Sequence, residues 1–292
     1  MVVISYLNRP MLHKSESAHV QQTTSKMNAH FVLVHGFCHG GWCWYKIKCQ
    51  LENLGFKVSC PDLKASGIDQ TDPNTVFSFE EYNEPLIDLL STFPDDEKVI
   101  LVGHSVGGFS VTQATDRFGK KLILVAIYLA ASMYRPGVTP QDDINYGAPD
   151  FSKYGGASNI FDVNFGLGPE KPATSILMRK EFQREIYYNM SPQEDVALAS
   201  MLLRPAPTYA VPSLRFTNDG DEGVEKVPCI YIRTMRDQMM RAEKQENMIN
   251  KCQPWKAYKI ESDHSAFFSA PDALVSILVE AAASVGYDAP NP

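Results

Sequence analysis

The residues Gly103-His104-Ser105-Val106-Gly107 place a serine between two glycines, directly after the apolar run 99–102 and directly before a helical stretch. This spacing is typical of a sharp strand-to-helix turn, because glycines two positions before and after the serine let the strand and the helix approach closely. The N-terminal N–H groups of the helix would then lie near the serine hydroxyl. The pattern therefore predicts Ser105 as a nucleophile on an α/β scaffold.

Strands and helices alternate on both sides of this motif. We expect strands at 31–34, 57–60, 99–102 and 122–131, and helices at 44–54, at 79–92 and from the motif to about Gly119. The alternation breaks over 132–221, which is rich in Pro, Gly, Tyr and Met and has one helical stretch at 191–203 but no strong strand. It resumes with strands at 229–232 and 257–260 and helices at 241–250 and 271–285. Such alternation favours a parallel sheet with helices on both faces.

The expected architecture is thus an α/β-hydrolase fold, with a mostly parallel sheet flanked by helices and an inserted cap. The core would consist of residues 30–131 and 222–287, the cap of 132–221, and the C-terminal tail of 288–292. Residues 1–29 are polar and lack the apolar stretch of a secretory signal, so they predict a flexible extension and a cytoplasmic protein. An organelle transit peptide is the alternative, although Glu16 and the few arginines argue against it.

A serine hydroxyl needs a neighbouring base to become a good nucleophile. In this fold the order along the chain is serine, acid, histidine, and only His264 follows Ser105 among the seven histidines. The acid should lie between them, just beyond a strand, which favours Asp237. Asp263 adjoins His264, so its side chain should diverge from the imidazole. Three further acidic residues lie in a loop that we expect to be solvated: Asp219, Asp221 and Glu222.

A serine nucleophile that attacks a carbonyl group also needs backbone N–H groups that stabilise the negatively charged oxygen of the tetrahedral intermediate. The residue after the nucleophile, Val106, should provide one of them. The turn His35-Gly36-Phe37, which ends the first strand, should provide the other through the Phe37 N–H. The alternative interpretation of this turn is that it only ends the strand.

Composition narrows the class of ligand. The net charge is −7 and no basic stripe is present, so nucleic acid is not an expected partner and an uncharged substrate fits better than an anion. No apolar run approaches the roughly 20 residues of a membrane span. The six cysteines form no CxxC pair or zinc-like cluster, and the chain has neither a dinucleotide fingerprint nor a P-loop. We therefore expect reduced cysteines, no metal and no cofactor.

Several motifs resemble the plant methylesterase family, which includes a salicylate-binding esterase, polyneuridine aldehyde esterase and related hydroxynitrile lyases. They are HFVLVHG at 30–36, CHGGW at 38–42, WYK at 44–46, DLKASG at 62–67, the stretch 98–108, SPQ at 191–193, LRP at 203–205, and Asp263-His264. The resemblance covers about 30–287. It implies a nucleophile at Ser105, an acid at Asp237, a base at His264 and a mostly apolar tunnel. A homodimer is compatible with it.

Within that family, three stretches are most similar to the esterase that hydrolyses methyl indole-3-acetate: WYKIKC at 44–49, GLGPE at 166–170 and ESDHS at 261–265. The resemblance thus implies a serine carboxylesterase acting on the methyl ester of a small hydrophobic plant metabolite or hormone. Phe37 departs from the family's usual small residue, and its ring would narrow the acyl pocket.

Three alternatives stay open at this point. Hydroxynitrile lyases share the fold and the triad, but they have a threonine where Gly36 stands and a lysine where Ser265 stands. A receptor for a small hydrophobic ligand would keep the same pocket without fast turnover. A broad carboxylesterase would have no single natural substrate.

Overall fold

The computed structural model of the chain describes residues 29–133, 150–215 and 227–287. A six-stranded parallel sheet has the strand order β2-β1-β3-β4-β7-β8. The expected parallel sheet is therefore confirmed. The strands are β1 (His30–Val34), β2 (Lys57–Ser59), β3 (Val99–His104), β4 (Ile123–Leu129), β7 (Cys229–Thr234) and β8 (Lys256–Ile260).

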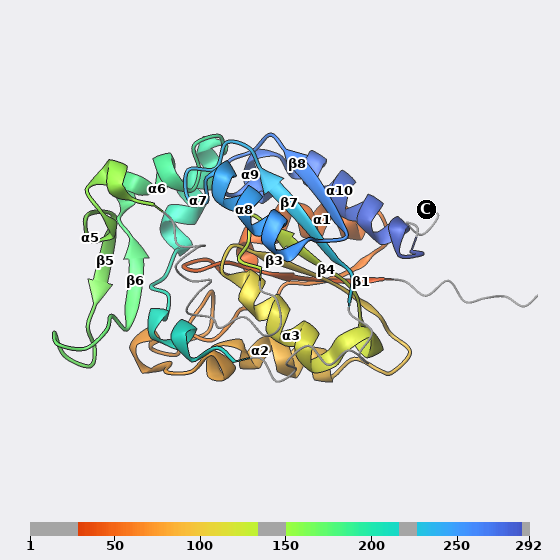
Figure 1. The fold of residues 1–292 in the computed structure, drawn as a ribbon, viewed down its shortest axis with the longest axis horizontal. Helices are drawn as coiled ribbons and strands as arrows, with labels where there is room; N and C mark the ends of the chain where they lie inside the picture. The colour runs from red at the N-terminus through yellow and green to blue at the C-terminus, as the bar shows by residue number, and fades with distance from the viewer. Residues whose placement is uncertain (1–28, 134–149, 216–226, 288–292) are drawn as a thin grey trace, which may run out of the picture.

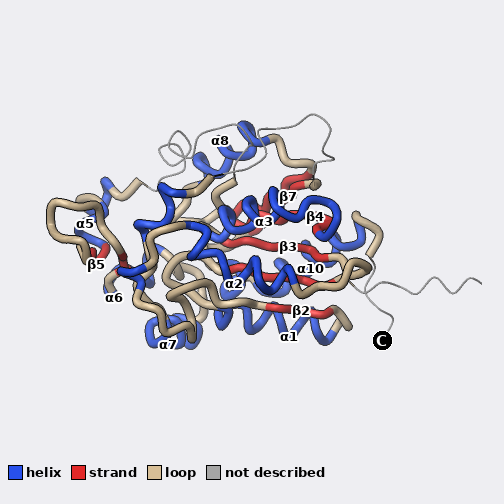
Figure 2. The backbone as a smooth tube through the Cα atoms, turned by 90° about the horizontal axis from the view of Figure 1, so that it is seen from below, coloured by secondary structure: helices blue, strands red, loops and turns tan. Residues whose placement is uncertain are grey.

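Helices cover both faces of the sheet (Figures 1 and 2). One face carries α1 (Tyr45–Asn53) and α10 (Pro271–Ser284), and the other carries α2 (Phe79–Ser91), α3 (Gly107–Leu122) and α8 (Ala242–Cys252). Successive residues of β1 alternate between the two cores, with Phe31 on one side and Val32 on the other. Burial on both faces explains why the central strands β1, β3 and β4 are largely apolar.

The carboxyl ends of the six strands lie along the same edge of the sheet, because all the strands are parallel. At this edge β1 leads into the turn at Gly36, and β3 ends one residue before Ser105. The loops after β7 and β8 carry Asp237 and His264. The topology therefore brings together four loops that are far apart in the sequence.

Residues 150–215 contain helices α5 (Ala157–Ile160), α6 (Lys180–Ile186) and α7 (Gln193–Leu202), and strands β5 (Phe161–Asn164) and β6 (Ser175–Met178). The expectation that this region lacks a strong strand is wrong, since β5 and β6 pair as an antiparallel hairpin. Its four-residue strands expose Asp162, Val163 and Asn164, so they lack the apolar alternation of a longer strand. Burial of Phe161 and Met178 holds the hairpin.

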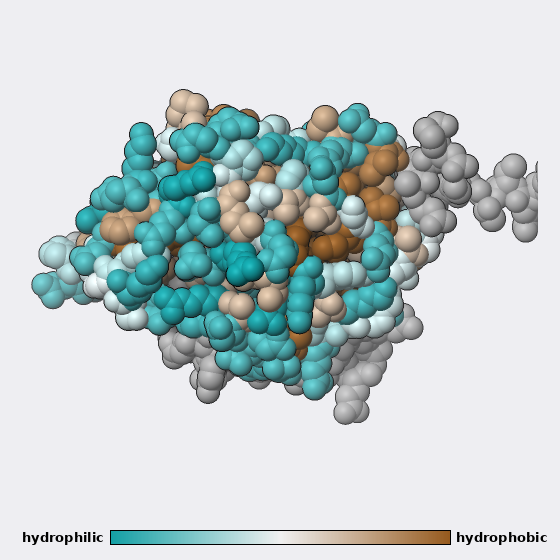
Figure 3. Space-filling model, turned by 90° about the horizontal axis from the view of Figure 1, so that it is seen from above, coloured by the Kyte–Doolittle hydropathy of each residue, from teal (hydrophilic) through white to brown (hydrophobic). Residues whose placement is uncertain are grey.

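The shorter elements are the α9 helix (Ala266–Ser269) and the 3-10 helices Gly41–Trp44, Pro73–Thr75, Ser152–Tyr154 and Thr208–Ser213. None of the described helices is long and apolar enough to cross a membrane. The face drawn in Figure 3 is covered largely by hydrophilic residues, with smaller hydrophobic areas. The assignment of 132–221 to a cap remains our proposal, because 134–149 and 216–221 lie outside the described residues.

Candidate active site

Ser105 lies in the turn between β3 and α3 with a backbone φ of 54°, in the left-handed region that non-glycine residues rarely adopt. The hydrogen bond from its N–H to the Leu129 carbonyl (3.2 Å) helps to hold this conformation. A Cβ on Gly103 would lie 2.7 Å from the Gly107 carbonyl oxygen, and one on Gly107 would lie 2.5 Å from the His35 carbonyl oxygen. Only glycine at these two positions leaves room for the strand, the helix and the neighbouring turn to meet.

His264 lies in the loop after β8 and lines the same cavity as Ser105. Its Nδ1 lies 2.8 Å from Asp237 Oδ2, and both side chains are buried. Its carbonyl oxygen is 2.9 Å from His104 Nε2, so the residue before the serine holds the histidine loop. Since an ionised carboxylate only accepts, His264 Nδ1 carries the proton of the neutral ring and Nε2 keeps a lone pair. The ring therefore has the tautomer of a general base.

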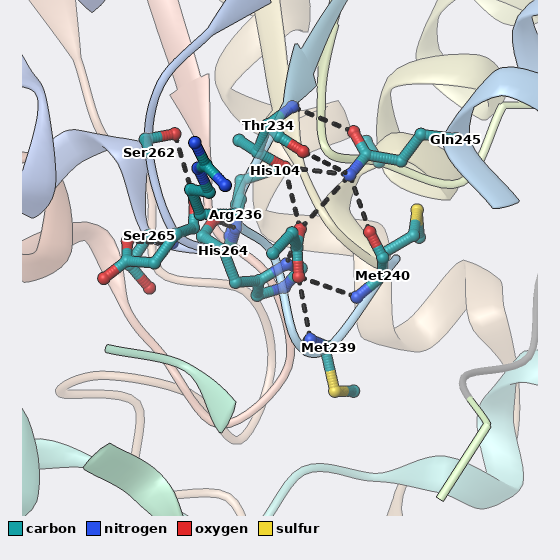
Figure 4. A network of polar contacts seen from close by, with 12 residues as sticks. His104, Thr234, Arg236, Met239, Met240, Gln245, Ser262, His264 and Ser265 are labelled. Atoms are coloured by element: carbon teal, nitrogen blue, oxygen red, sulfur yellow. Dashed lines mark hydrogen bonds and ion pairs between the residues drawn. The ribbon is translucent and has the colours of Figure 1, made fainter. Parts of the chain in front are cut away.

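The Asp237 carboxylate accepts hydrogen bonds on both oxygens, and Figure 4 labels the partner residues Thr234, Met239, Met240 and His264. Oδ1 accepts from the N–H groups of Met239 (2.8 Å) and Met240 (2.7 Å), and Oδ2 accepts from Thr234 Oγ1 (2.8 Å) as well as from His264. Gln245 of α8 is buried and bridges Thr234 and Met240 through its amide. This network orients the carboxylate toward the imidazole.

Ser105 and His264 both line a small cavity of about 40 Å³. No hydrogen bond between their side chains is present in the described structure, and such contacts are often long before a substrate binds. Aromatic and aliphatic side chains make up much of the wall. The lining consists of Phe37, His39, His104, Ser105, Val106, Phe161, Ile176, Tyr187, Met239 and His264.

Phe37 and Val106 each have a backbone N–H group that could stabilise an oxyanion. Within the part of the chain that the structure describes, neither group donates a hydrogen bond to the protein. Both residues line the cavity together with Ser105. Two free donors beside a serine are what an oxyanion site requires.

Histidines surround the site without adding charge to it. Burial lowers the pKa of His39 to about 3 and also lowers the pKa of His35 and His104. All three rings are therefore neutral near pH 7. Burial raises the pKa of the Cys38 thiol to about 12, so this cysteine stays protonated and is a poor nucleophile.

The structure brings together all the residues that the sequence predicted for the site: Ser105, His264, Asp237, Phe37 and Val106. Asp263 bonds to Met190 and Ser191 instead of the imidazole. The acidic residues 219, 221 and 222 lie outside the described residues.

Sequence reasoning missed the supporting residues Thr234, Gln245, His39 and Tyr188. Thr234 alone had a local signal, because it lies three residues before Asp237. Tyr188 and His39 are 149 residues apart, so only the fold reveals their contact. Among the described residues, no group of three or more His, Cys, Asp or Glu side chains could hold a metal ion.

Comparison with known proteins places this geometry in a family. A profile of the alpha/beta hydrolase family matches residues 31–277. Methylesterase 17 of Arabidopsis thaliana is 44% identical over 278 residues, which cover 94% of this chain and 99% of the relative. A pheophorbidase of Raphanus sativus is 46% identical over 253 residues, covering 86% of this chain and 93% of the relative.

A solved structure agrees with the sequence matches. The crystal structure of the Arabidopsis methylesterase MES16 has a TM-score of 0.75 and 42% identity, and the match covers 88% of this chain and 99% of that one. A serine turn at the carboxyl edge of a parallel sheet accords with these matches. This chain therefore belongs to the alpha/beta hydrolase family and, within it, to the plant methylesterases, which are carboxylic ester hydrolases.

Proposed function

We propose that the protein is a serine carboxylesterase that hydrolyses the methyl ester of a small hydrophobic acid through Ser105, His264 and Asp237. The observation that carries the proposal is the 2.8 Å contact between His264 Nδ1 and Asp237 Oδ2, behind a cavity that His264 shares with Ser105. In this arrangement His264 Nε2 is free to take the serine proton.

The mechanism follows from these positions. Ser105 Oγ transfers its proton to His264 Nε2 and attacks the ester carbonyl carbon. The N–H groups of Phe37 and Val106 stabilise the oxyanion, and Asp237 stabilises the charged imidazolium. His264 then protonates the leaving methoxide, methanol departs, and a water molecule activated by the same imidazole hydrolyses the acyl-enzyme.

The walls of the cavity support an uncharged, hydrophobic acyl group. No Lys, Arg, Asp or Glu is among the described lining residues, so a charged acyl group would lose its hydration without gaining a partner. Methyl indole-3-acetate is our first candidate, on the resemblance at 44–49, 166–170 and 261–265.

Two observations favour an esterase over a hydroxynitrile lyase. Cyanide elimination needs a cation near the leaving group, and the described lining has no lysine or arginine. A Cβ on Gly36 would lie 2.9 Å from Ser105 Cβ and 3.1 Å from His104 Nδ1. A threonine at this position would therefore displace the serine in this chain.

The test is release of free acid from a panel of methyl esters: indole-3-acetate, jasmonate, salicylate and a larger alkaloid ester. We expect selective hydrolysis of one ester and its loss in Ser105→Ala, because that change removes the attacking oxygen. Retained turnover in Ser105→Ala would refute the mechanism. Binding without turnover, seen as a rise in Tm with a ligand, would instead favour a receptor.

Action on one ester in the cytoplasm as a homodimer remains part of this proposal. Residues 1–28, which would carry any targeting signal, lie outside the described residues. Cell fractionation tests the cytoplasmic location, and sedimentation of the full chain tests the homodimer.

A further inference from the structure

The short connection between α6 and α7, residues 187–191, contacts three of the four loops that carry a proposed catalytic group. We call this connection the 187–191 segment. Its side chains and backbone reach the turn after β1, the loop after β7 and the loop after β8.

The first contact reaches the oxyanion turn. His39 Nδ1 lies 2.9 Å from the Phe37 carbonyl oxygen, which can only accept, so Nδ1 carries the proton. The ring is neutral, and its Nε2 therefore accepts from the Tyr188 hydroxyl at 2.7 Å. Tyr188 and His39 are both buried. The tyrosine hydroxyl thus holds the far side of the histidine ring that binds the Phe37 carbonyl.

The second set of contacts reaches the base. Asp263, next to His264, is fully buried, and no cation pairs with it in the described part of the chain. Its Oδ2 accepts from the Met190 N–H (2.9 Å) and Ser191 Oγ (2.8 Å). Its Oδ1 accepts from the Ser265 N–H (3.0 Å) and Ser269 Oγ (2.7 Å). The carboxylate therefore joins the 187–191 segment to both sides of His264.

Two further contacts complete the set. The Tyr187 ring stacks on the His264 ring, with centroids 6.0 Å apart and planes at 23°. Asn189 Nδ2 donates to the carbonyl oxygen of Arg236 (3.2 Å), the residue before Asp237. The segment therefore contacts the ring of His264 and also the loop that carries Asp237.

We infer that the 187–191 segment is a positioning element that sets the oxyanion donor and the base relative to each other, with Tyr188 and Ser191 as its main contacts. The inference rests on the proposed function. A displacement of about 1 Å in such a site lowers the rate by as much as about a hundredfold. Loss of either contact should therefore lower kcat while substrate binding, which relies on the cavity walls, changes little.

The experiment measures kcat and KM for 4-nitrophenyl acetate with the full chain carrying Tyr188→Phe, Ser191→Ala or both. We expect each single variant to lose about tenfold in kcat with KM within about twofold. In the double variant the loss should be smaller than the product of the single losses, because one release already loosens the other contact. Ser191→Thr keeps a hydroxyl and should retain most of the activity.

Tyr128→Phe is the matched control. Tyr128 is buried, and its hydroxyl lies 3.0 Å from Thr112 Oγ1, away from the cavity lining. The Tyr128→Phe variant also loses a buried hydroxyl and one hydrogen bond. It should therefore lower Tm about as much as Tyr188→Phe does, and its kcat should stay within about twofold of wild type. If this control loses as much kcat as Tyr188→Phe does, the loss in Tyr188→Phe reflects lower stability alone. That result would overturn the inference.

Two other results would also overturn it. One is a kcat within about twofold of wild type in both single variants, and the other is a double loss equal to the product of the single losses.

If Tyr188→Phe fails to fold, Ser191→Ala and Ser191→Thr decide alone. Ser105→Ala separates the two proposals. If it keeps activity, the proposed function fails; if it is inactive while the segment variants are unimpaired, only the positioning role fails.

Discussion

Replacing Asp237 by asparagine changes one oxygen into an NH₂ group, and the surrounding donors decide where that group must lie. Oδ1 receives the N–H groups of Met239 (2.8 Å) and Met240 (2.7 Å). An NH₂ group there would face two donors, so the amide oxygen must occupy this position. The NH₂ group then takes the place of Oδ2, 2.8 Å from His264 Nδ1.

The consequence is a reversed tautomer of His264. An NH₂ group opposite Nδ1 donates to it, so the imidazole proton moves to Nε2, which can then no longer accept the proton of Ser105. The equivalent change in serine proteases lowers kcat by about 10⁴-fold with intact geometry, which corresponds to about 5.4 kcal/mol in the activation barrier. We expect a loss of the same order in Asp237→Asn.

The assay is the turnover of 4-nitrophenyl acetate by Asp237→Asn, with folding checked by thermal unfolding. Asp195→Asn is the matched control, because Asp195 is also buried and accepts from Lys46 and Tyr45 away from the cavity lining. Its kcat should stay within about threefold of wild type. A folded Asp237→Asn protein with kcat within about tenfold of wild type would refute the assigned role of Asp237.

Two other predictions concern stability. Gly107→Ala places a Cβ 2.5 Å from the His35 carbonyl oxygen. The substitution should therefore destabilise the fold by about 2 kcal/mol and lower Tm by about 4–8 °C. An unchanged melting curve would contradict the close approach of Gly107 to His35. Burial lowers the pKa of His39 to about 3, so the unfolded chain binds more protons than the folded one between that pKa and about 6.5. Stability should therefore fall as the pH drops from 6.5. At pH 4.5 His39 accounts for about 3 kcal/mol of the loss, measured by denaturant unfolding as the difference between wild type and His39→Gln; equal losses in the two proteins would contradict it.

Most of the fold was predictable because its signals are local. The central strands β1, β3 and β4 consist largely of continuous apolar runs, and the turn at Ser105 is specified by five consecutive residues. The β5–β6 hairpin was not predictable in this way. Its four-residue strands have exposed polar positions, and Thr174 Oγ1 beside β6 reaches Asn74 Oδ1 (2.6 Å), 100 residues away in the chain. Contacts of that kind leave no local pattern.

The sequence alone determined which residue types could act and in what order: a serine in a glycine turn, one histidine after it, and an aspartate beyond a strand. The tertiary structure decided how these groups are oriented. The contact between His264 and Asp237 spans 27 residues, and that between Tyr188 and His39 spans 149. The positions of such side chains depend on how the loops pack at the carboxyl edge of the sheet. That packing arises from the whole core, so no local stretch of sequence specifies it.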